Sequence, residues 1–388
     1  MTKPIDPFSL YIHIPYCISK CPYCDFNSHV VAEIPQAQYV SALVRELDGY
    51  GAVEDWDGRP VQSIFFGGGT PSTFAPASIG KLLNQVAATF PMRADCEITL
   101  EANPGTIDRD NFHGYHDAGV NRISIGVQSF QPGLLRFLGR AHSADEARQA
   151  LQTVRHAGFE NFSLDLIYAN PGQSLRDLEA DLNEALAFQP PHLSAYNLTF
   201  EEGTPFYREY RAGRIKSLSE EAEIAMAVFI EKKLRDAGLQ RYEISNYARP
   251  GARSRHNVNY WRGGDYLGLG AGAHSYKRWD GNALFGKRWS NEKNPGRYMA
   301  LAREGRAIVD QEEIDRAKAA GEFMFMGLRM TEGISSQAFA SRFGPVPRAF
   351  YPQIDDWLEG ELMEETNGYL RLTQKGLLLA NSIFVDFL

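Results

Sequence analysis

The stretch YCISKCPYCDFNSH (residues 16–29) holds three of the four cysteines of the chain, Cys17, Cys21 and Cys24, in the pattern C-x3-C-x2-C. It directly follows a strand-like run, SLYIHIP (9–15). Three thiolates in one loop can bind three irons of a [4Fe–4S] cluster and leave the fourth iron without a protein ligand. Such an open coordination position lets a metal centre bind a substrate or cofactor directly. The spacing therefore predicts a cluster with an open site.

Two other interpretations of these cysteines stay open. A structural zinc ion needs four ligands, and His29 or His13 would supply the fourth. Alternatively, the cysteines are small buried residues that cluster by chance. The fourth cysteine, Cys96, precedes alternating apolar residues in a strand-like run, and we expect it in the core.

Length and composition exclude several classes of protein. The chain has 388 residues, 44% of them hydrophobic, which is enough for two or three domains or one large α/β domain with an appendage. The net charge of −8 and the absence of a long basic block argue against nucleic acid as a partner. We find no signal peptide in MTKPIDPFSLYIHIP and no run of about 18 apolar residues. We therefore expect a cytoplasmic protein without a transmembrane segment, which meets a membrane only through a partner.

Outward from the cysteine loop, strand-like and helical segments alternate. The strands are expected at 9–15, 61–69, 96–104, 122–130, 161–169 and 192–200, and the helices at 39–51, 77–90, 109–119, 144–158, 174–188 and 219–238. Six successive β/α units predict a parallel sheet, either doubly wound or curled into a barrel. In both forms, functional side chains lie at the carboxyl ends of the strands.

Polar residues and glycines do cluster at those strand ends. GGGTPS (67–72) ends the second strand, and Glu101, Gln128 and Asp165 lie at or near the ends of later ones. Glycines allow a ligand to approach the backbone closely, although a tight turn would explain them equally well. A polar residue in a buried strand needs a partner, which a neighbouring loop could also supply. From its local sequence alone, LGRAHS, we expect Arg140 to be a surface arginine.

The remaining third of the chain changes character. Residues 239–290 are rich in glycine, arginine and aromatics without clean periodicity, and we expect a linking segment there. Residues 291–388 combine helical patterns with a turn and a short strand, which is typical of a small winged-helix-like domain. The first domain should then span residues 1–238.

The cysteine pattern, with Tyr23 before the last cysteine, resembles the signature of the radical S-adenosylmethionine (SAM) superfamily. The resemblance implies a partial (β/α)6 barrel, similar to a TIM barrel, in which Cys17, Cys21 and Cys24 bind a [4Fe–4S] cluster. It also implies that the amino and carboxylate groups of SAM take the fourth iron. Gly68, Gly69 and Thr70 would contact the methionine end of SAM.

A closer resemblance is to the oxygen-independent coproporphyrinogen III oxidase group. It rests on YIHIPYCISKCPYCDF, IFFGGGTPS, EANPG, GVNRISIGVQSF, LGRAHS and FSLDLIYANPGQ, from residue 9 to about 175. By position it implies contacts to SAM from Tyr11, Gly68, Glu101, Gln128, Arg140 and Asp165. Two departures argue against decarboxylase activity: Phe26 replaces a further cysteine of the oxidase, and the oxidase's N-terminal extension is missing before the first strand.

These departures point to the haem-chaperone (HemW) branch of that group, which is marked by H-N-x-x-Y-W. The chain has HNVNYW at 256–261. Histidine is a common axial ligand of haem iron, and Tyr260 and Trp261 offer flat faces to a porphyrin. Arginines suit its propionates, and three stand nearby: Arg253, Arg255 and Arg262. We expect His256 as the haem ligand, with His274 as second choice. A packed loop that joins the barrel to the second domain is the alternative.

Three functions follow from these patterns. The first is a haem chaperone that holds a [4Fe–4S] cluster with SAM and passes haem to acceptors such as respiratory enzymes. The second is the oxidase, which decarboxylates coproporphyrinogen III to protoporphyrinogen IX. The third is a radical enzyme with an unrelated substrate. The oligomeric state stays open, with a homodimer among the options.

Overall fold

A computed structural model describes residues 6–106, 109–279 and 284–387. Its centre is a curved sheet whose six middle strands lie in chain order and are all parallel. These strands are β1 (Phe8–Ile14), β4 (Val61–Gly68), β5 (Met92–Ala102), β6 (Arg122–Gln128), β7 (Phe162–Tyr168) and β8 (His192–Asn197). Each of the six expected strands is present within a few residues of its expected bounds. The partial (β/α)6 barrel is thereby confirmed.

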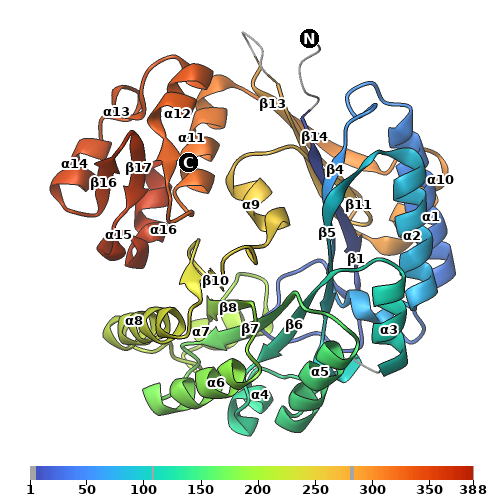
Figure 1. The fold of residues 1–388 in the computed structure, drawn as a ribbon, viewed down its shortest axis with the longest axis horizontal. Helices are drawn as coiled ribbons and strands as arrows, with labels where there is room; N and C mark the ends of the chain where they lie inside the picture. Colours follow the sequence, from blue (N-terminus) through green and yellow to red (C-terminus); the bar gives the residue numbers. More distant parts are fainter. Residues whose placement is uncertain (1–5, 107–108, 280–283, 388) are drawn as a thin grey trace.

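Helices cover the outer, convex face of this sheet (Figure 1). The six expected ones are α1 (Gln36–Gly51), α2 (Pro76–Thr89), α3 (Arg109–Asp117), α5 (Ala144–His156), α6 (Leu175–Ala187) and α8 (Glu220–Asp236). Capping boxes start two of them, Ser143 with Glu146 and Ser174 with Asp177. Two short helices were not predicted, α4 (Pro132–Phe137) and α7 (Pro205–Arg211), because neither is long enough for clear periodicity.

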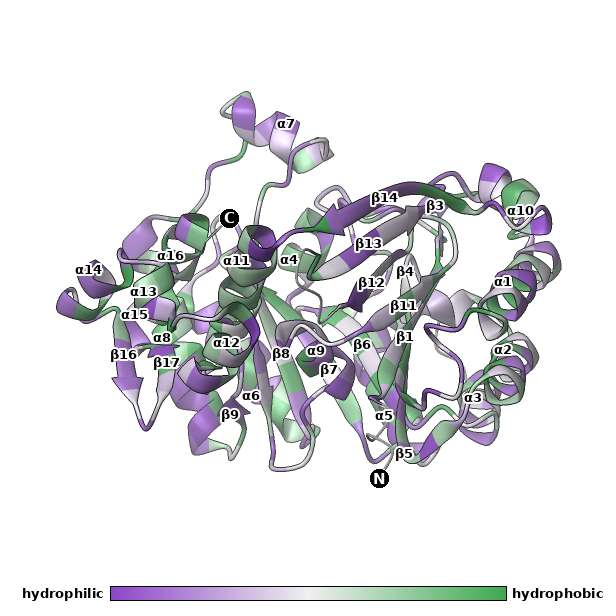
Figure 2. Cartoon of the chain, turned by 90° about the horizontal axis from the view of Figure 1, so that it is seen from above, coloured by the Kyte–Doolittle hydropathy of each residue, from purple (hydrophilic) through white to green (hydrophobic). Residues whose placement is uncertain are grey.

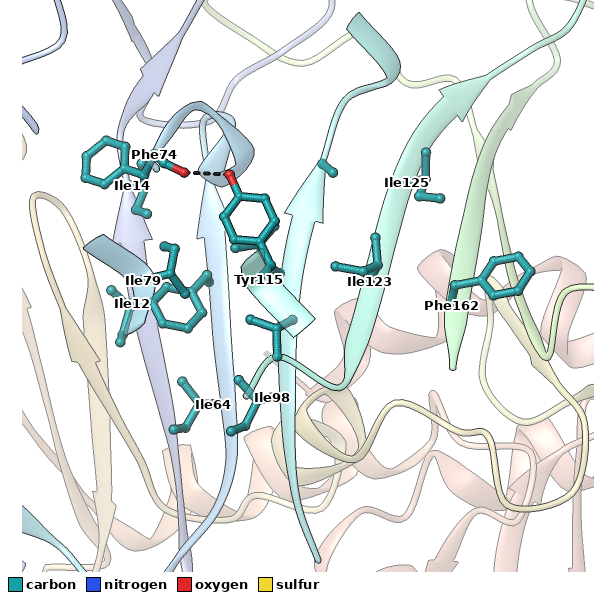
Figure 3. Packing of buried hydrophobic residues seen from close by; sticks show 14 of the residues in the cluster. Ile12, Ile14, Ile64, Phe74, Ile79, Ile98, Tyr115, Ile123, Ile125 and Phe162 are labelled. Atoms are coloured by element: carbon teal, nitrogen blue, oxygen red, sulfur yellow. Dashed lines mark hydrogen bonds between the residues drawn. The ribbon is translucent and has the colours of Figure 1, made fainter. Parts of the chain in front are cut away.

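The main core lies between the sheet and these helices (Figure 3). It includes β-branched residues from four adjacent strands, Ile12, Ile64, Ile98 and Ile123. Full burial of one such side chain stabilises the fold by roughly 1.5–3 kcal/mol. The buried Tyr115 hydroxyl has a hydrogen-bond partner in this core, because it donates to the Phe74 carbonyl oxygen at 2.5 Å. Cys96 is buried in the same core, as expected.

The stretch expected as a linking segment instead extends the sheet at both edges. It contains β9 (Gln240–Arg241), β10 (Asn246–Ala248), α9 (Arg255–Trp261), β11 (Tyr266–Leu269), β12 (His274–Arg278) and β13 (Gly286–Asn291). β11 pairs parallel with β1, and β10 pairs antiparallel with β8. After α10 (Pro295–Arg303), β14 (Ile308–Ile314) forms the outer edge, which is exposed and largely hydrophilic (Figure 2). The new strands are only two to six residues long, so their sequences carry little periodicity.

The C-terminal unit has a separate core around a three-stranded antiparallel sheet. Its elements are α11 (Arg316–Gly327), β15 (Ile334–Ser335), α12 (Ser336–Phe343), α13 (Pro347–Phe350), α14 (Ile354–Glu359), β16 (Met363–Thr366), β17 (Tyr369–Leu372), α15 (Gln374–Leu378), α16 (Ala380–Phe384) and η3 (Val385–Phe387). Helices with a small antiparallel wing match the winged-helix-like expectation. Tyr276 and Phe285 join this core from the main sheet.

Helix α9 lies inside the curve of the main sheet, in the centre of Figure 1. It packs against β4 on one side and α11 on the other. The cysteine loop lies between β2 (Tyr16–Cys17) and β3 (His29–Val30), and two 3₁₀ turns follow the neighbouring strands, η1 (Pro71–Thr73) and η2 (Pro104–Thr106). None of the helices in the described part of the chain is long and apolar enough to cross a membrane.

Candidate functional site

The cysteine loop begins just after β1 and is closed at its base by the pairing of β2 with β3. Cys17, Cys21 and Cys24 are free and partly exposed there. The Thr70 hydroxyl points at the Cys17 sulfur over 3.5 Å, and Arg140 Nη1 lies 3.4 Å from the Cys21 sulfur. Hydrogen-bond donors aimed at sulfur stabilise the thiolate form, which is the form that binds metal. Two of the three sulfurs thus have a neighbouring donor that favours the thiolate form.

The described residues also bear on the zinc alternative. Both ring nitrogens of His13 are engaged, with the Tyr11 hydroxyl and the Asn27 carbonyl oxygen, each at 2.9 Å. His29 Nε2 lies 3.1 Å from the Asn27 side-chain oxygen. The geometry therefore gives the zinc interpretation no support.

The glycine run at the end of β4 is a requirement of close packing. Gly68 has φ +113°, and a Cβ atom there would lie 2.4 Å from Cε1 of His13. A Cβ on Gly69 would lie 2.6 Å from the Tyr16 carbonyl oxygen. The Gly69 and Thr70 amides donate to the carbonyl oxygens of Ile14 and Tyr16, both at 2.8 Å. No side chain other than hydrogen fits at Gly68 without displacement, so this backbone forms a bare shelf beside the cysteine loop.

Two acidic side chains stand behind this shelf. Glu101, near the end of β5, accepts a hydrogen bond from the Gly68 amide at 3.2 Å. Asp165, on β7, accepts from the hydroxyls of Ser124 at 3.0 Å and Ser163 at 3.2 Å. Burial raises the pKa of Glu101 to about 8, and the charge of Asp165 adds to the effect. Burial also raises the pKa of Asp165. A cationic ligand would stabilise both carboxylates.

Gln128 and Arg140 complete the rim. Gln128 has φ +67°, an unusual conformation for a residue other than glycine, and its side-chain oxygen is buried with no hydrogen-bond partner among the described residues. Arg140 Nη2 donates to the Asn103 side-chain oxygen and to the Gly126 carbonyl oxygen, at 2.5 and 2.9 Å. Asn103 in turn donates to Thr70 at 2.9 Å. Asn103 was not predicted as a site residue, although it is the third residue of the EANPG motif.

These groups line one cavity of about 490 Å³, which we call the cofactor cavity. Ten of the predicted residues lie on its wall: Cys17, Cys21, Cys24, Gly68, Gly69, Thr70, Glu101, Gln128, Arg140 and Asp165. Thiols with donors aimed at them, a bare shelf, buried carboxylates and an orphaned amide oxygen fit a cluster with a cationic amino-acid ligand. Tyr11 and His256 are the two predicted residues that the structure keeps out of this cavity.

His256 lies deep inside the barrel, only 1% exposed. Its Nδ1 is 3.0 Å from the Ser63 hydroxyl and its Nε2 is 2.9 Å from the Tyr260 hydroxyl. Its ring stacks on Phe65 with centroids 5.0 Å apart, and burial lowers its pKa to about 3. Glu97 fixes the start of α9 by accepting from the His256 amide at 3.1 Å. In this conformation both ring nitrogens are occupied, so the structure does not present His256 to a haem iron.

The arginines expected at haem propionates are engaged elsewhere. Arg253 and Arg262 pair with Glu332, and Arg255 pairs with Asp95. These charges hold the loop around α9 to its surroundings instead of facing a ligand. Asn257, the next residue, makes no hydrogen bond to the His256 ring among the described residues. Ser63 and Tyr260 orient the ring.

A second cavity, of about 730 Å³, lies between the edge of the sheet and the C-terminal unit. We call it the aromatic cleft, because its wall carries Tyr11, Phe26, Tyr260, Trp261, Tyr266, Tyr276 and Phe323. His274, Arg288, Lys293 and Arg342 also line it. The aromatic cleft meets the cofactor cavity at Gly68 and Glu101, and both share part of the cysteine loop. Arg288, Lys293 and Arg342 were not predicted as site residues, because the segments that carry them contain no recognised motif.

Comparison with known proteins shows to which family a chain with this geometry belongs. The radical SAM superfamily model matches residues 11–185, and the HemN C-terminal domain model matches residues 314–379. The chain is 40% identical over 388 residues to "Heme chaperone HemW" of Escherichia coli K12, covering 99% of both chains. It is 36% identical over 384 residues to the protein of the same name from Bacillus subtilis, covering 98% of this chain and 99% of that protein.

Among solved structures, the coproporphyrinogen III oxidase HemN of Escherichia coli superposes with a TM-score of 0.83. It covers 100% of this chain and 91% of its own, at 24% identity, which supports a shared fold. The identity to the HemW proteins extends over nearly the full length of the chain, so it shows the family as well as the fold. The chain belongs to the HemW family of the radical SAM superfamily.

Proposed function

We propose that this protein is a haem chaperone. It binds a [4Fe–4S] cluster and SAM in the cofactor cavity, binds haem in the aromatic cleft, and transfers the haem to acceptors such as respiratory enzymes. The relatives named heme chaperone support the class of function. The observation that carries the proposal is the pair of adjoining cavities, one lined by three cysteines and the other by aromatic rings and cations.

In the cofactor cavity, Cys17, Cys21 and Cys24 would hold the cluster, which supplies an electron to the sulfonium of bound SAM when it is reduced. Thr70 and Arg140 donate toward two of the sulfurs and so favour the thiolates. Burial raises the pKa of Cys17 and Cys24, so these thiols must lose protons when iron binds. Glu101 and Asp165 supply negative charge for the cationic groups of SAM. The shelf at Gly68 and Gly69 lets the methionine end approach the backbone.

The aromatic cleft suits a flat, mostly apolar ligand with charged edges. Pockets of this size, lined by aromatic groups with a few polar ones, are typical sites for cofactor-sized molecules. Seven aromatic side chains contribute to its wall. The lysine and arginine side chains that also line the cleft can bind the propionates. The cleft lies between two separately packed cores, so a small relative movement of the C-terminal unit would open it. A carrier needs such a route for release.

One observation favours the oxidase as a second candidate. Because the two cavities meet at Glu101, a tetrapyrrole in the cleft would adjoin the SAM site. Against it stands Phe26, which is 62% exposed on the cysteine loop where the oxidase has a further cysteine. Anaerobic incubation of cluster-loaded protein with coproporphyrinogen III, SAM and a reductant separates the two. Divinyl product at many turnovers per cluster would establish the oxidase, and we expect none.

The chaperone itself is tested by transfer. Haem-loaded protein is mixed with the haem-free form of a b-type respiratory enzyme subunit, and enzyme activity and absorbance are followed. We expect the protein to bind an equimolar amount of haem. We also expect it to reconstitute the acceptor faster than haem bound to albumin does. Absence of saturable haem binding by the cluster-loaded protein would refute the function. We place the protein in the cytoplasm, with contact to membrane-bound acceptors made through those acceptors.

A further inference from the structure

We propose that His274 is the axial ligand of the haem iron in the aromatic cleft, and that Lys293 binds a haem propionate beside it. This assignment rests on the proposed haem-binding function. It replaces the histidine of the HNVNYW motif by one on a different element, the strand β12.

The first argument compares the four histidines nearest to the two cavities. Both ring nitrogens are hydrogen-bonded in His13 and in His256, and Nε2 of His29 is held by Asn27. His274 is exposed, and no hydrogen bond or ion pair of its side chain occurs among the described residues. An iron ligand needs an accessible ring nitrogen with a free lone pair. Of the four, His274 meets this condition without any rearrangement.

The strand geometry sets the direction of His274. On β12 successive side chains alternate between the two faces. Tyr276, two residues on, lines the aromatic cleft together with His274. Ser275, between them, is buried on the other face and accepts from the Gly268 amide at 2.9 Å. The strand therefore presents an imidazole and a phenol ring side by side to the cleft.

The charges around His274 suit a ligand with anionic edges. Lys293 is exposed, lines the cleft and makes no ion pair among the described residues. Arg288 also lines the cleft, but Glu322 binds it at 2.6 Å and reduces its free charge. Lys293 therefore keeps its charge available for an anionic edge of the ligand.

Other residues of the cleft supply apolar surface for a flat ring. Phe323 and Met326 lie three residues apart on α11, so they share one face of that helix, and both line the cleft. Trp261, at the end of α9, adds a third large side chain. A porphyrin bound to His274 would thus contact the barrel through its ligand and the C-terminal unit through apolar surface.

The test is a haem titration of cluster-loaded protein, followed by the Soret band and by electron paramagnetic resonance. The variants are His274→Ala, His274→Gly, Lys293→Glu and Lys293→Arg, with His156→Ala as the matched control. His156 is exposed at the end of α5 and lines neither cavity. We expect His274→Ala to weaken haem binding by about tenfold or more and to change the ligand-dependent spectrum, since even indirect supports of a metal ligand are worth that much. Added imidazole should restore the spectrum in His274→Gly.

Lys293→Glu should weaken binding further than Lys293→Arg, because only the first reverses the charge. His156→Ala should match the wild type throughout, and circular dichroism should show that all variants fold. An unchanged spectrum and affinity in His274→Ala, with haem still bound, would overturn the ligand assignment and leave the haem chaperone intact. Failure of the wild type to bind haem would overturn both.

Discussion

The cofactor cavity and the aromatic cleft share a wall but are built in different ways. The cofactor cavity lies at the carboxyl ends of consecutive parallel strands, so most of its side chains lie at the end of a recognisable strand or in the loop after it. The aromatic cleft collects side chains from the cysteine loop, α9, the edge strands β11 to β13 and α11, which belong to different layers. Parallel β/α order places functional groups by rule, whereas a cleft between layers depends on how the layers pack. The residues of the cofactor cavity can therefore be predicted from sequence motifs, whereas those of the aromatic cleft cannot.

The largest effect should come from the cysteines. Replacing Cys17, Cys21 and Cys24 together by alanine should abolish the cluster, measured as protein-bound iron and sulfide after anaerobic reconstitution. Haem binding should survive, because no cysteine lines the aromatic cleft. Cys96→Ala is the control: its thiol is buried in the core away from the loop, and it should keep a full cluster. Parallel loss of cluster and haem in the triple variant would mean that the two cavities are one site.

His256→Ala should act on stability rather than on haem. It leaves Ser63 and Tyr260 without their shared partner and opens a void inside the barrel. Such a loss costs about 2–5 kcal/mol of unfolding free energy, to be measured by urea denaturation of the cluster-free protein. The Soret spectrum of the folded variant should equal that of the wild type. A changed spectrum with full stability would return the ligand role to His256.

Gly68→Ala should damage the wall that both cavities share. The new methyl group would meet the His13 ring, and φ +113° is strained for alanine. Strain of this kind costs about 1–3 kcal/mol, and we expect a lower affinity for SAM in equilibrium dialysis. Gly49→Ala is the matched control: no atom lies within 4 Å of its added carbon, and it lies in helix α1. It should leave SAM affinity unchanged and raise stability slightly.

Glu101 should give the most selective signal, a pH dependence. Its carboxyl has an ordinary value of 4.5 and a pKa of about 8 in the folded chain, so the folded state holds a proton that the unfolded state has lost. Stability should therefore fall as the pH rises from about 4.5 to about 8, and SAM affinity should rise over the upper part of this range because the carboxylate is charged. Glu101→Gln should flatten both profiles. Identical profiles in variant and wild type would contradict the role of Glu101 in the cofactor cavity.

The sequence predicted the parts of the fold that follow local rules. Six strands and six helices were found because alternation and periodicity are local, and ten of the predicted residues meet in one cavity because strand ends converge. The extra strands were missed because β11 is four residues long and pairs with β1, far away in the chain. The motif HNVNYW showed which residue types stand together but not that Ser63 and Glu97, from other strands, hold His256 inside the barrel. Burial of that kind is set by packing, which a motif does not record.

The most direct measurement counts ligands on one sample. Cluster-loaded protein is titrated with haem at saturating SAM, and iron–sulfur content, bound SAM and bound haem are determined together. Two adjoining but separate cavities predict that each chain keeps its cluster and its SAM while it takes up an equimolar amount of haem. Haem uptake that displaces SAM or cluster in proportion would contradict the two-cavity arrangement.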